Sequence, residues 1–178
     1  GLAPGRYQAG DGSELIDRAA PLRRRRRRFA HAHRRNRFGD GVIGGRRVVL
    51  DAATGIGSEA KALLTNVTDT ANSSLSAITD SGNINITEKI GTVAIDQVKA
   101  LSGGNVTLTA TKGILVGQQS GSWCEGLIKG GNITLNAAST LTTSGGQVGS
   151  GIAHPLVLEA GQLLNSAVSV KAYGDIFL

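Results

Sequence analysis

An internal repeat constrains the fold of this chain more than any other feature of its sequence. Residues 103–110 read Gly-Gly-Asn-Val-Thr-Leu-Thr-Ala, and residues 130–137, which lie 27 positions later, read Gly-Gly-Asn-Ile-Thr-Leu-Asn-Ala. A looser copy, Val-Val-Leu-Asp-Ala-Ala, occupies residues 48–53. Self-similarity at a fixed offset is typical of solenoids and repeat arrays, in which each repeat packs on its neighbours.

A second match, without gaps, occurs at an offset of 92 residues. It relates residues 56–58 to 148–150, Leu64 to Leu156, and residues 81–86 to 173–178. The same short segment types therefore recur at widely separated places in the chain.

Apolar residues within the repeats recur at every second position, which predicts β-strands because successive side chains on a strand point to opposite faces. Gly, Asn and Ser separate these segments and predict tight turns, too short to contain helical crossovers. The pairs that define the alternation are Ile84/Ile86, Val93/Ile95, Val106/Leu108, Ile133/Leu135, Val168/Val170 and Ile176/Leu178.

This pattern predicts an all-β fold, a right-handed parallel β-helix (β-solenoid) in which about three short strands form one coil of roughly 27 residues. Aromatic residues make up only 3% of the chain, so Val, Ile, Leu and Ala must stack coil upon coil in the core. We expect the turn asparagines Asn105 and Asn132 to cap turns or form side-chain ladders. A β-sandwich is the alternative fold.

Several of these segments resemble the shaft repeats of filamentous-haemagglutinin-like adhesins, which are exported by two-partner secretion or as autotransporter passengers. The resemblance lies in residues 104–110, 53–58 and 172–178, and it extends over residues 44–178. It implies a rod of right-handed β-helix in a much longer secreted or outer-membrane-associated surface protein. The secretion-domain motif of the Asn-Pro-Asn-Gly type, which the family carries at its N-terminus, has no counterpart in this sequence.

Charge divides the chain into two parts. All thirteen arginines lie within residues 6–47, where four acids leave a formal charge of about +9, while residues 48–178 carry about −3. We therefore assign residues 1–43 to a disordered Arg-rich segment or a stretch translated out of frame, and residues 44–178 to the β-helix.

The basic residues of this segment are the candidate binding site for a polyanion, because clustered arginines bind phosphate backbones in a salt-dependent manner. Phe29 and Phe38 could stack on bases. The candidate residues are Arg23, Arg24, Arg25, Arg26, Arg27, Arg28, Arg34, Arg35 and Arg37.

No residue pattern indicates catalysis, a cofactor or a metal. The single cysteine, Cys124, is expected to be a partly buried loop thiol, and His154 a surface or turn histidine. The acids of residues 48–178 are scattered singly, with Glu88 and Asp96 among the closest pairs. Five Asn-x-Ser/Thr tripeptides follow from turn asparagines that precede strands, and they do not by themselves indicate glycosylation. We therefore expect that the protein is not an enzyme.

The sequence therefore predicts a structural shaft segment of a large bacterial adhesin. Its expected partners are surface glycans or receptors, together with an outer-membrane transporter for the parent protein. No stretch of about 18 apolar residues occurs, so we expect no membrane-spanning helix. The alternatives are nucleic-acid or polyanion binding through Arg23–Arg28 and a β-helical polysaccharide-processing enzyme, which would need acids clustered on one face.

Overall fold

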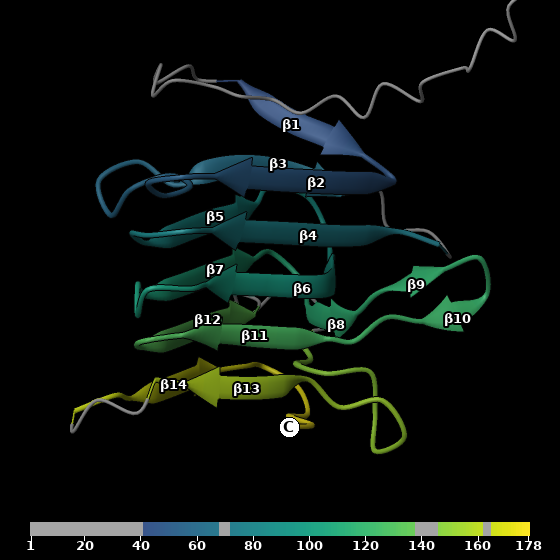
Figure 1. Ribbon diagram of the computed structural model, residues 1–178. Coiled ribbons are helices and arrows are strands. Elements are labelled where there is room, and N and C mark those ends of the chain that lie inside the picture. Colours follow the sequence, from purple (N-terminus) through teal and green to yellow (C-terminus); the bar gives the residue numbers. More distant parts are fainter. Residues whose placement is uncertain (1–40, 68–71, 138–145, 162–164) are drawn as a thin grey trace, which may run out of the picture.

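The computed structural model describes residues 41–67, 72–137, 146–161 and 165–178, and these residues form β-strands and turns without a helix. Two six-stranded parallel sheets face each other across one core (Figure 1). Sheet A contains β1 (Val42–Gly45), β3 (Leu63–Val67), β5 (Ile84–Glu88), β7 (Val106–Ala110), β12 (Ile133–Ala137) and β14 (Val168–Lys171). Sheet B contains β2 (Arg47–Ala52), β4 (Ser74–Thr79), β6 (Val93–Ala100), β11 (Leu127–Gly130) and β13 (Val157–Ala160), and β8 (Ile114–Val116) pairs with β6. The predicted all-β class is confirmed.

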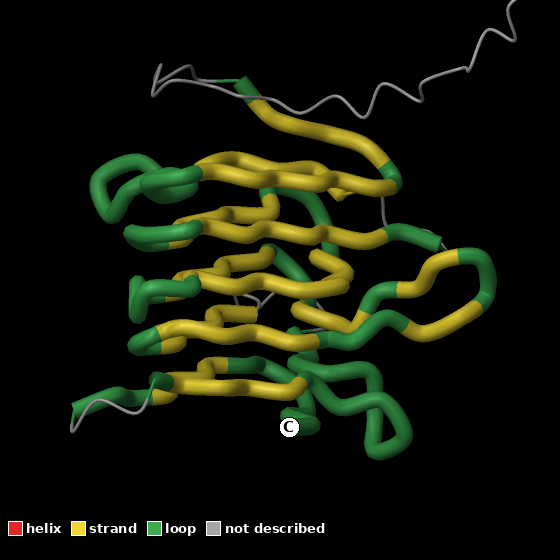
Figure 2. Tube along the Cα trace, in the orientation of Figure 1, coloured by secondary structure: helices red, strands yellow, loops and turns green. Residues whose placement is uncertain are grey.

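The chain passes back and forth between the two sheets. β1 belongs to sheet A, β2 to sheet B and β3 to sheet A, and this alternation continues to β14 with one interruption, since β8 and β11 both belong to sheet B. Strands of one sheet pair in parallel with the next strand of that sheet along the chain, except that β8 and β11 both pair with β6 (Figure 2). The connection between parallel neighbours is therefore a strand of the opposite sheet rather than a helix.

The register explains the 27-residue repeat. Val106 pairs with Ile133 and Ala110 with Ala137, so the two sequence copies lie directly side by side in sheet A. The step varies along the fold, since Ile84 pairs with Val106, 22 residues away, Val48 with Leu75, 27 away, and Ile133 with Val168, 35 away. The predicted coil length of about 27 residues is therefore found in two steps, β2 to β4 and β7 to β12, while other steps are shorter or longer.

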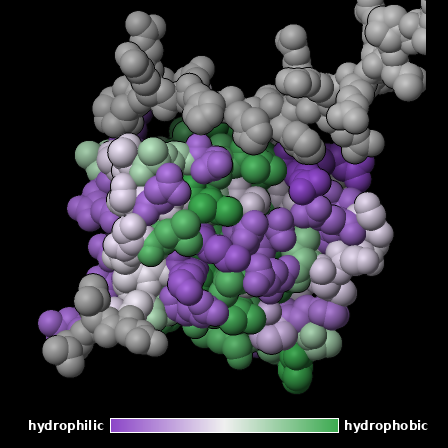
Figure 3. All heavy atoms as spheres, in the orientation of Figure 1, coloured by the Kyte–Doolittle hydropathy of each residue, from purple (hydrophilic) through white to green (hydrophobic). Residues whose placement is uncertain are grey.

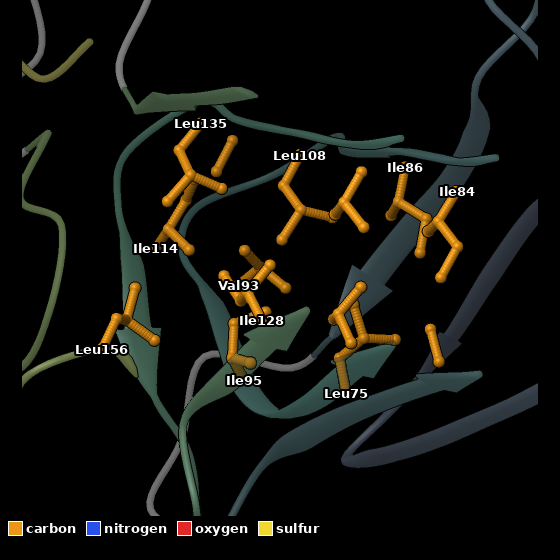
Figure 4. Close-up of a cluster of buried hydrophobic side chains, with 14 of the residues drawn as sticks. Leu75, Ile84, Ile86, Val93, Ile95, Leu108, Ile114, Ile128, Leu135 and Leu156 are labelled. Carbon is orange, nitrogen blue, oxygen red and sulfur yellow. The ribbon is translucent and has the colours of Figure 1, made fainter. Parts of the chain in front are cut away.

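Aliphatic side chains from both sheets fill the space between them (Figure 4). Ile84, Ile133 and Leu135 of sheet A and Ile95 and Ile128 of sheet B are fully buried. Burying an aliphatic side chain of this size contributes roughly 1.5–3 kcal/mol. The prediction of an aliphatic core is confirmed, because the buried hydrophobic residues are Val, Leu, Ile and Ala.

Asparagine side chains connect successive strands of sheet A at the turn before each strand. The Asn83 Oδ1 atom accepts a hydrogen bond from the Asn105 backbone N–H at 2.9 Å, and Asn105 Oδ1 accepts one from the Asn132 N–H at 3.0 Å. Asn132 Oδ1 continues the series by accepting from the Ala167 N–H at 2.8 Å. The predicted side-chain ladder is therefore confirmed for Asn105 and Asn132.

The 92-residue match corresponds to a recurring loop rather than to stacked neighbours. Ile56 bridges Ile84 beside sheet A, whereas Val148 bridges Ile114 and Ile176 beside sheet B. In both copies the chain leaves the core at the following glycine, and each such glycine has a positive φ, 68° at Gly57 and 85° at Gly149.

The two copies of this loop differ in length by one residue. Leu63 returns after the first loop and packs against the core, and the buried Leu156 returns after the second. The ungapped alignment instead matches Leu156 with Leu64, the residue after Leu63, which pairs with Thr87 of β5. The second loop is therefore one residue longer, and the ungapped alignment shifts there.

One carboxylate, Glu88, is buried inside the fold at 1% exposure. Its Oε2 atom accepts a hydrogen bond from the Thr65 hydroxyl at 2.8 Å, and both carboxylate oxygens lie within 3.2 Å of the Val67 backbone nitrogen. The end of β3 is thus tied to the end of β5. A buried polar group requires such partners, because desolvation without them is costly.

Candidate functional site

Two loops extend away from the sheets on the same side of the molecule (Figure 2). The first, residues 117–126, contains the short antiparallel hairpin of β9 (Gln118–Gln119) and β10 (Ser122–Trp123). The second, residues 149–155, follows Val148. In β6, Ile95 and Gln97 are separated by Asp96 alone, whereas their partners Val116 and Leu127 are separated by the whole first loop. The hairpin is therefore an insertion into one step of the sheet.

The hairpin is held against an earlier part of the chain. The Gln118 N–H donates to the Ser73 carbonyl at 3.2 Å, and the Gly121 N–H donates to Asn72 Oδ1 at 2.9 Å. The Gln119 side-chain amide lies 3.3 Å from Ser74 Oγ and 3.2 Å from Asp96 Oδ2, and it donates to both. These bonds fix the direction in which β10 carries its side chains.

The second loop closes on itself and on β8. The Ser150 N–H donates to the His154 carbonyl at 3.0 Å, and the His154 N–H donates to the Gly151 carbonyl at 3.1 Å. The Ser150 hydroxyl also accepts a hydrogen bond from the Val116 N–H at 2.8 Å. His154 is consequently presented from a short, internally bonded loop.

An aromatic stack joins the two loops. The Trp123 and His154 rings have centroids 4.0 Å apart and an interplanar angle of 17°. Trp123 remains 42% exposed, and Ile152 at the tip of the second loop is 89% exposed. The pair thus forms a fixed aromatic surface that remains open to solvent. We call the stacked rings of Trp123 and His154 the loop platform.

Charged side chains beside the loops are arranged in pairs. Lys99 and Lys129 are neighbours in the register of sheet B, where two like charges repel. Lys99 Nζ lies 3.3 Å from Glu125 Oε2, and Lys129 Nζ lies 2.9 Å from Glu159 Oε2. Figure 3 shows that hydrophilic and hydrophobic residues are mixed over this face. Both lysines of this neighbouring pair therefore have an acidic partner.

Cys124 follows Trp123 at the base of the hairpin and is partly buried, as predicted. Burial raises the pKa of its thiol, and the nearby Asp96 carboxylate raises the pKa further, while a hydrogen bond with Gln119 and the charge of Arg47 act in the opposite direction. A raised pKa lowers the thiolate fraction at neutral pH and makes the sulfur a weaker nucleophile.

His154 lies in a turn, as predicted, with the indole of Trp123 against its ring. Glu88 and Asp96, close in sequence, have different partners, since Glu88 binds Thr65 and Val67 whereas Asp96 binds Gln119. Within the residues that the structure describes, no group of three or more His, Cys, Asp or Glu side chains could hold a metal ion.

The predicted polyanion site lies outside the described residues. This applies to Arg23–Arg28 and to Arg34, Arg35 and Arg37, so polyanion binding stays a prediction. Two later arginines are described. Arg46 makes an interaction of its own, and Arg47 is an exposed residue of β2.

The asparagines of the Asn-x-Ser/Thr tripeptides occupy several kinds of position. Asn105 and Asn132 belong to the ladder, Asn72 accepts a hydrogen bond from the hairpin, and Asn85 is buried at 6% exposure. For at least these four, the fold itself uses the side chain or encloses it. A structural reason therefore accounts for asparagine at these places.

The loop platform was not predicted from the sequence. Trp123 and His154 are 31 positions apart in the sequence. Their rings stack because the loops 117–126 and 149–155 extend from the sheets on the same side of the molecule. One signal was present, because residues 117–126 lack the apolar alternation of the segments before and after them.

Comparison with protein families, curated proteins and solved structures finds no match for this chain. Within the described ranges, no helix has the length and apolar character that crossing a membrane requires.

Proposed function

We propose that residues 44–178 are a length of right-handed parallel β-helix that serves as the shaft of a large secreted or cell-surface bacterial adhesin, similar to the filamentous-haemagglutinin-like proteins. Its role is mechanical, because stacked coils make a stiff rod that carries adhesive surfaces away from the cell. The observation that supports this most is the passage of the chain back and forth between two parallel sheets, in which strands from successive passes pair in register.

A β-sandwich made of two parallel sheets is the alternative fold. The coil is favoured by a third row of contacts, in which Val93 pairs with Ile114, Ile114 with Val148, and Val148 with Ile176. This row includes Val93 at the start of β6. The first residues of β6 pair with β8, and its later residues pair with β11. A coil with three sides accounts for such a row, and right-handed connections are the rule between parallel strands of one sheet.

The last strands of the stack leave apolar side chains exposed. Val168 is 45% exposed although its partner Ile133 is fully buried, and Ile176 is 46% exposed although Val148 is fully buried. In the proposed rod these residues are the surface on which a further coil of the parent protein packs. Repeat arrays require either such a neighbour or a polar cap at each end.

An antibody raised against the chain tests this function in the source cells. We expect it to detect a polypeptide much larger than 18.2 kDa in the surface or secreted fraction, and to reduce attachment of the cells to a host-cell layer. A band near 18.2 kDa confined to the cytoplasmic fraction would contradict the proposal. Antibody raised against an unrelated β-sheet protein is the control for non-specific blocking of attachment.

A further inference from the structure

The hairpin inserted at residues 117–126 contributes little to the core. Asp96 alone spans the equivalent position in β6, so sheet B continues there without any loop. The strands β9 and β10 have no fully buried residue, and their side chains are intermediate or exposed. Loops that a scaffold does not need for packing are frequent sites of binding.

The loop platform holds an aromatic ring in a fixed and accessible position. Four hydrogen bonds from Gln118, Gln119 and Gly121 hold the hairpin, and His154 stacks on the indole of Trp123 at 4.0 Å. Trp123 is the single tryptophan of the chain and remains 42% exposed. Leaving a large aromatic ring in water forgoes the burial that a partner would supply.

The charges beside the platform favour an uncharged ligand. Lys99 is paired with Glu125, so neither side chain offers an uncompensated charge to an anion or a cation. A single indole with one imidazole also lacks the several aromatic walls of a cage for a quaternary ammonium group. An apolar face with polar groups at its edge suits a ligand that is itself both apolar and hydroxylated.

We propose that the loop platform is a binding site for a neutral pyranose, whose C–H face stacks on the exposed side of the Trp123 indole. The ring C–H groups carry a partial positive charge and meet the negative face of the aromatic system. The carboxylate of Glu125, two residues along the chain from Trp123, supplies acceptors for ligand hydroxyls. The site deepens the proposed function, on which it rests for its adhesive role, because it places glycan contact on two loops of the shaft.

The single tryptophan allows a direct test with the full chain. Its emission is recorded while the methyl glycosides of glucose, galactose, mannose and N-acetylglucosamine are added one by one. We expect a saturable change with at least one of them, at the weak affinity of about 1 mM that a small contact area supports. Methyl glycosides stand for terminal sugars of glycoproteins and glycolipids, and oligomers of the same sugars stand for the interior of polysaccharides.

Variants then locate the binding. Ligand-observed NMR should show loss of binding for W123A and at least a tenfold weakening for H154A, which leaves the indole without its support. Y173A is the matched control, because Tyr173 is a comparably exposed aromatic residue at 49% that lies outside both loops. We expect Y173A to bind like the unchanged chain, and circular dichroism verifies that each variant retains its β-structure.

The outcomes separate this proposal from the shaft. Absence of a saturable response to every glycoside and oligomer overturns the pyranose site, as does binding that persists in W123A. Either result leaves detection of a large surface protein by the antibody unaffected. Conversely, a platform that binds sugar in a protein found only as an 18.2 kDa cytoplasmic chain would retain the site and contradict the shaft.

Discussion

Single asparagines connect neighbouring steps of sheet A through their side chains. Each Oδ1 atom of the ladder accepts the backbone N–H of the residue at the equivalent corner of the next step. The series passes from Asn83 to Asn105 and Asn132 and reaches Ala167, whose methyl group offers no acceptor. Turn asparagine thus acts here in the contact between steps, in addition to its local preference for turns.

Removal of one member of the ladder should destabilise the fold moderately. We expect Asn105→Ala to lower the free energy of unfolding by about 1 kcal/mol, because the Asn132 N–H loses its side-chain acceptor. Asn136→Ala, on the β12 strand and outside the ladder, is the control and should change it by less than about 0.5 kcal/mol. Urea unfolding followed by circular dichroism measures both, and equal effects would contradict the role of the ladder.

Gly57 is required at its position for two reasons. Its φ of 68° is unfavourable for a residue with a side chain, and a Cβ atom there would collide with the Asn85 carbonyl oxygen. Gly103 has a similar φ of 76°, but its Cβ would meet no atom within 4 Å. The pair therefore separates backbone strain from steric collision.

We expect Gly103→Ala to cost about 1 kcal/mol, the usual cost of a positive φ for alanine. Gly57→Ala should cost at least about 2 kcal/mol more, because the neighbouring strand β5 must move. The midpoint and slope of urea unfolding give both values. Equal losses in the two variants would show that the loop at Gly57 relaxes without displacing β5.

The hairpin of β9 and β10 is a separable element. The comparison of β6 with β8 and β11 indicates that one residue suffices where the chain inserts residues 117–126. Insertion of this kind is tolerated because the entropy of closing a loop grows slowly with its length. The step between β7 and β12 contains this insertion.

Replacement of residues 117–126 by a single aspartate should therefore leave the two sheets intact. We expect the β-sheet spectrum and a cooperative transition to remain, with the free energy of unfolding changed by less than about 2 kcal/mol. Excision of residues 106–115, which removes β7 with all of its buried side chains and part of β8, should abolish folding. An unfolded hairpin-deleted chain would show that the loop supports the core.

At the scale of the whole molecule, the features that follow from local sequence rules could be predicted. Alternation at Ile84 and Ile86 predicts a strand, and the matched segments at 103–110 and 130–137 predict neighbours in register. The 27-residue offset predicts only some of the steps, because connections of different length make the step vary from 22 residues between Ile84 and Val106 to 35 between Ile133 and Val168. The stack of Trp123 on His154 depends on where two insertions meet, which no local pattern encodes. Burial of Glu88 likewise depends on hydrogen-bond donors from β3.

The exposed apolar end of the stack governs how whole molecules meet. Val168 and Ile176 occupy positions that are fully buried one step earlier, and the outer edges of β13 and β14 have no neighbour within the described sheets. Open parallel edges with apolar side chains promote association between chains. We expect sedimentation velocity to detect oligomers of the full chain that grow with its concentration.

A lysine at this end should weaken that association. We expect Val168→Lys to raise the apparent dissociation constant at least tenfold, which corresponds to about 1.4 kcal/mol, because a charge would have to be buried between stacked molecules. Val49→Lys is the control, since Val49 is exposed to a similar degree, 49% against 45%, on the outer face of β2. It should leave the dissociation constant unchanged. A monomeric unchanged chain, or the same effect from both lysines, would show that association does not proceed through the end of the stack.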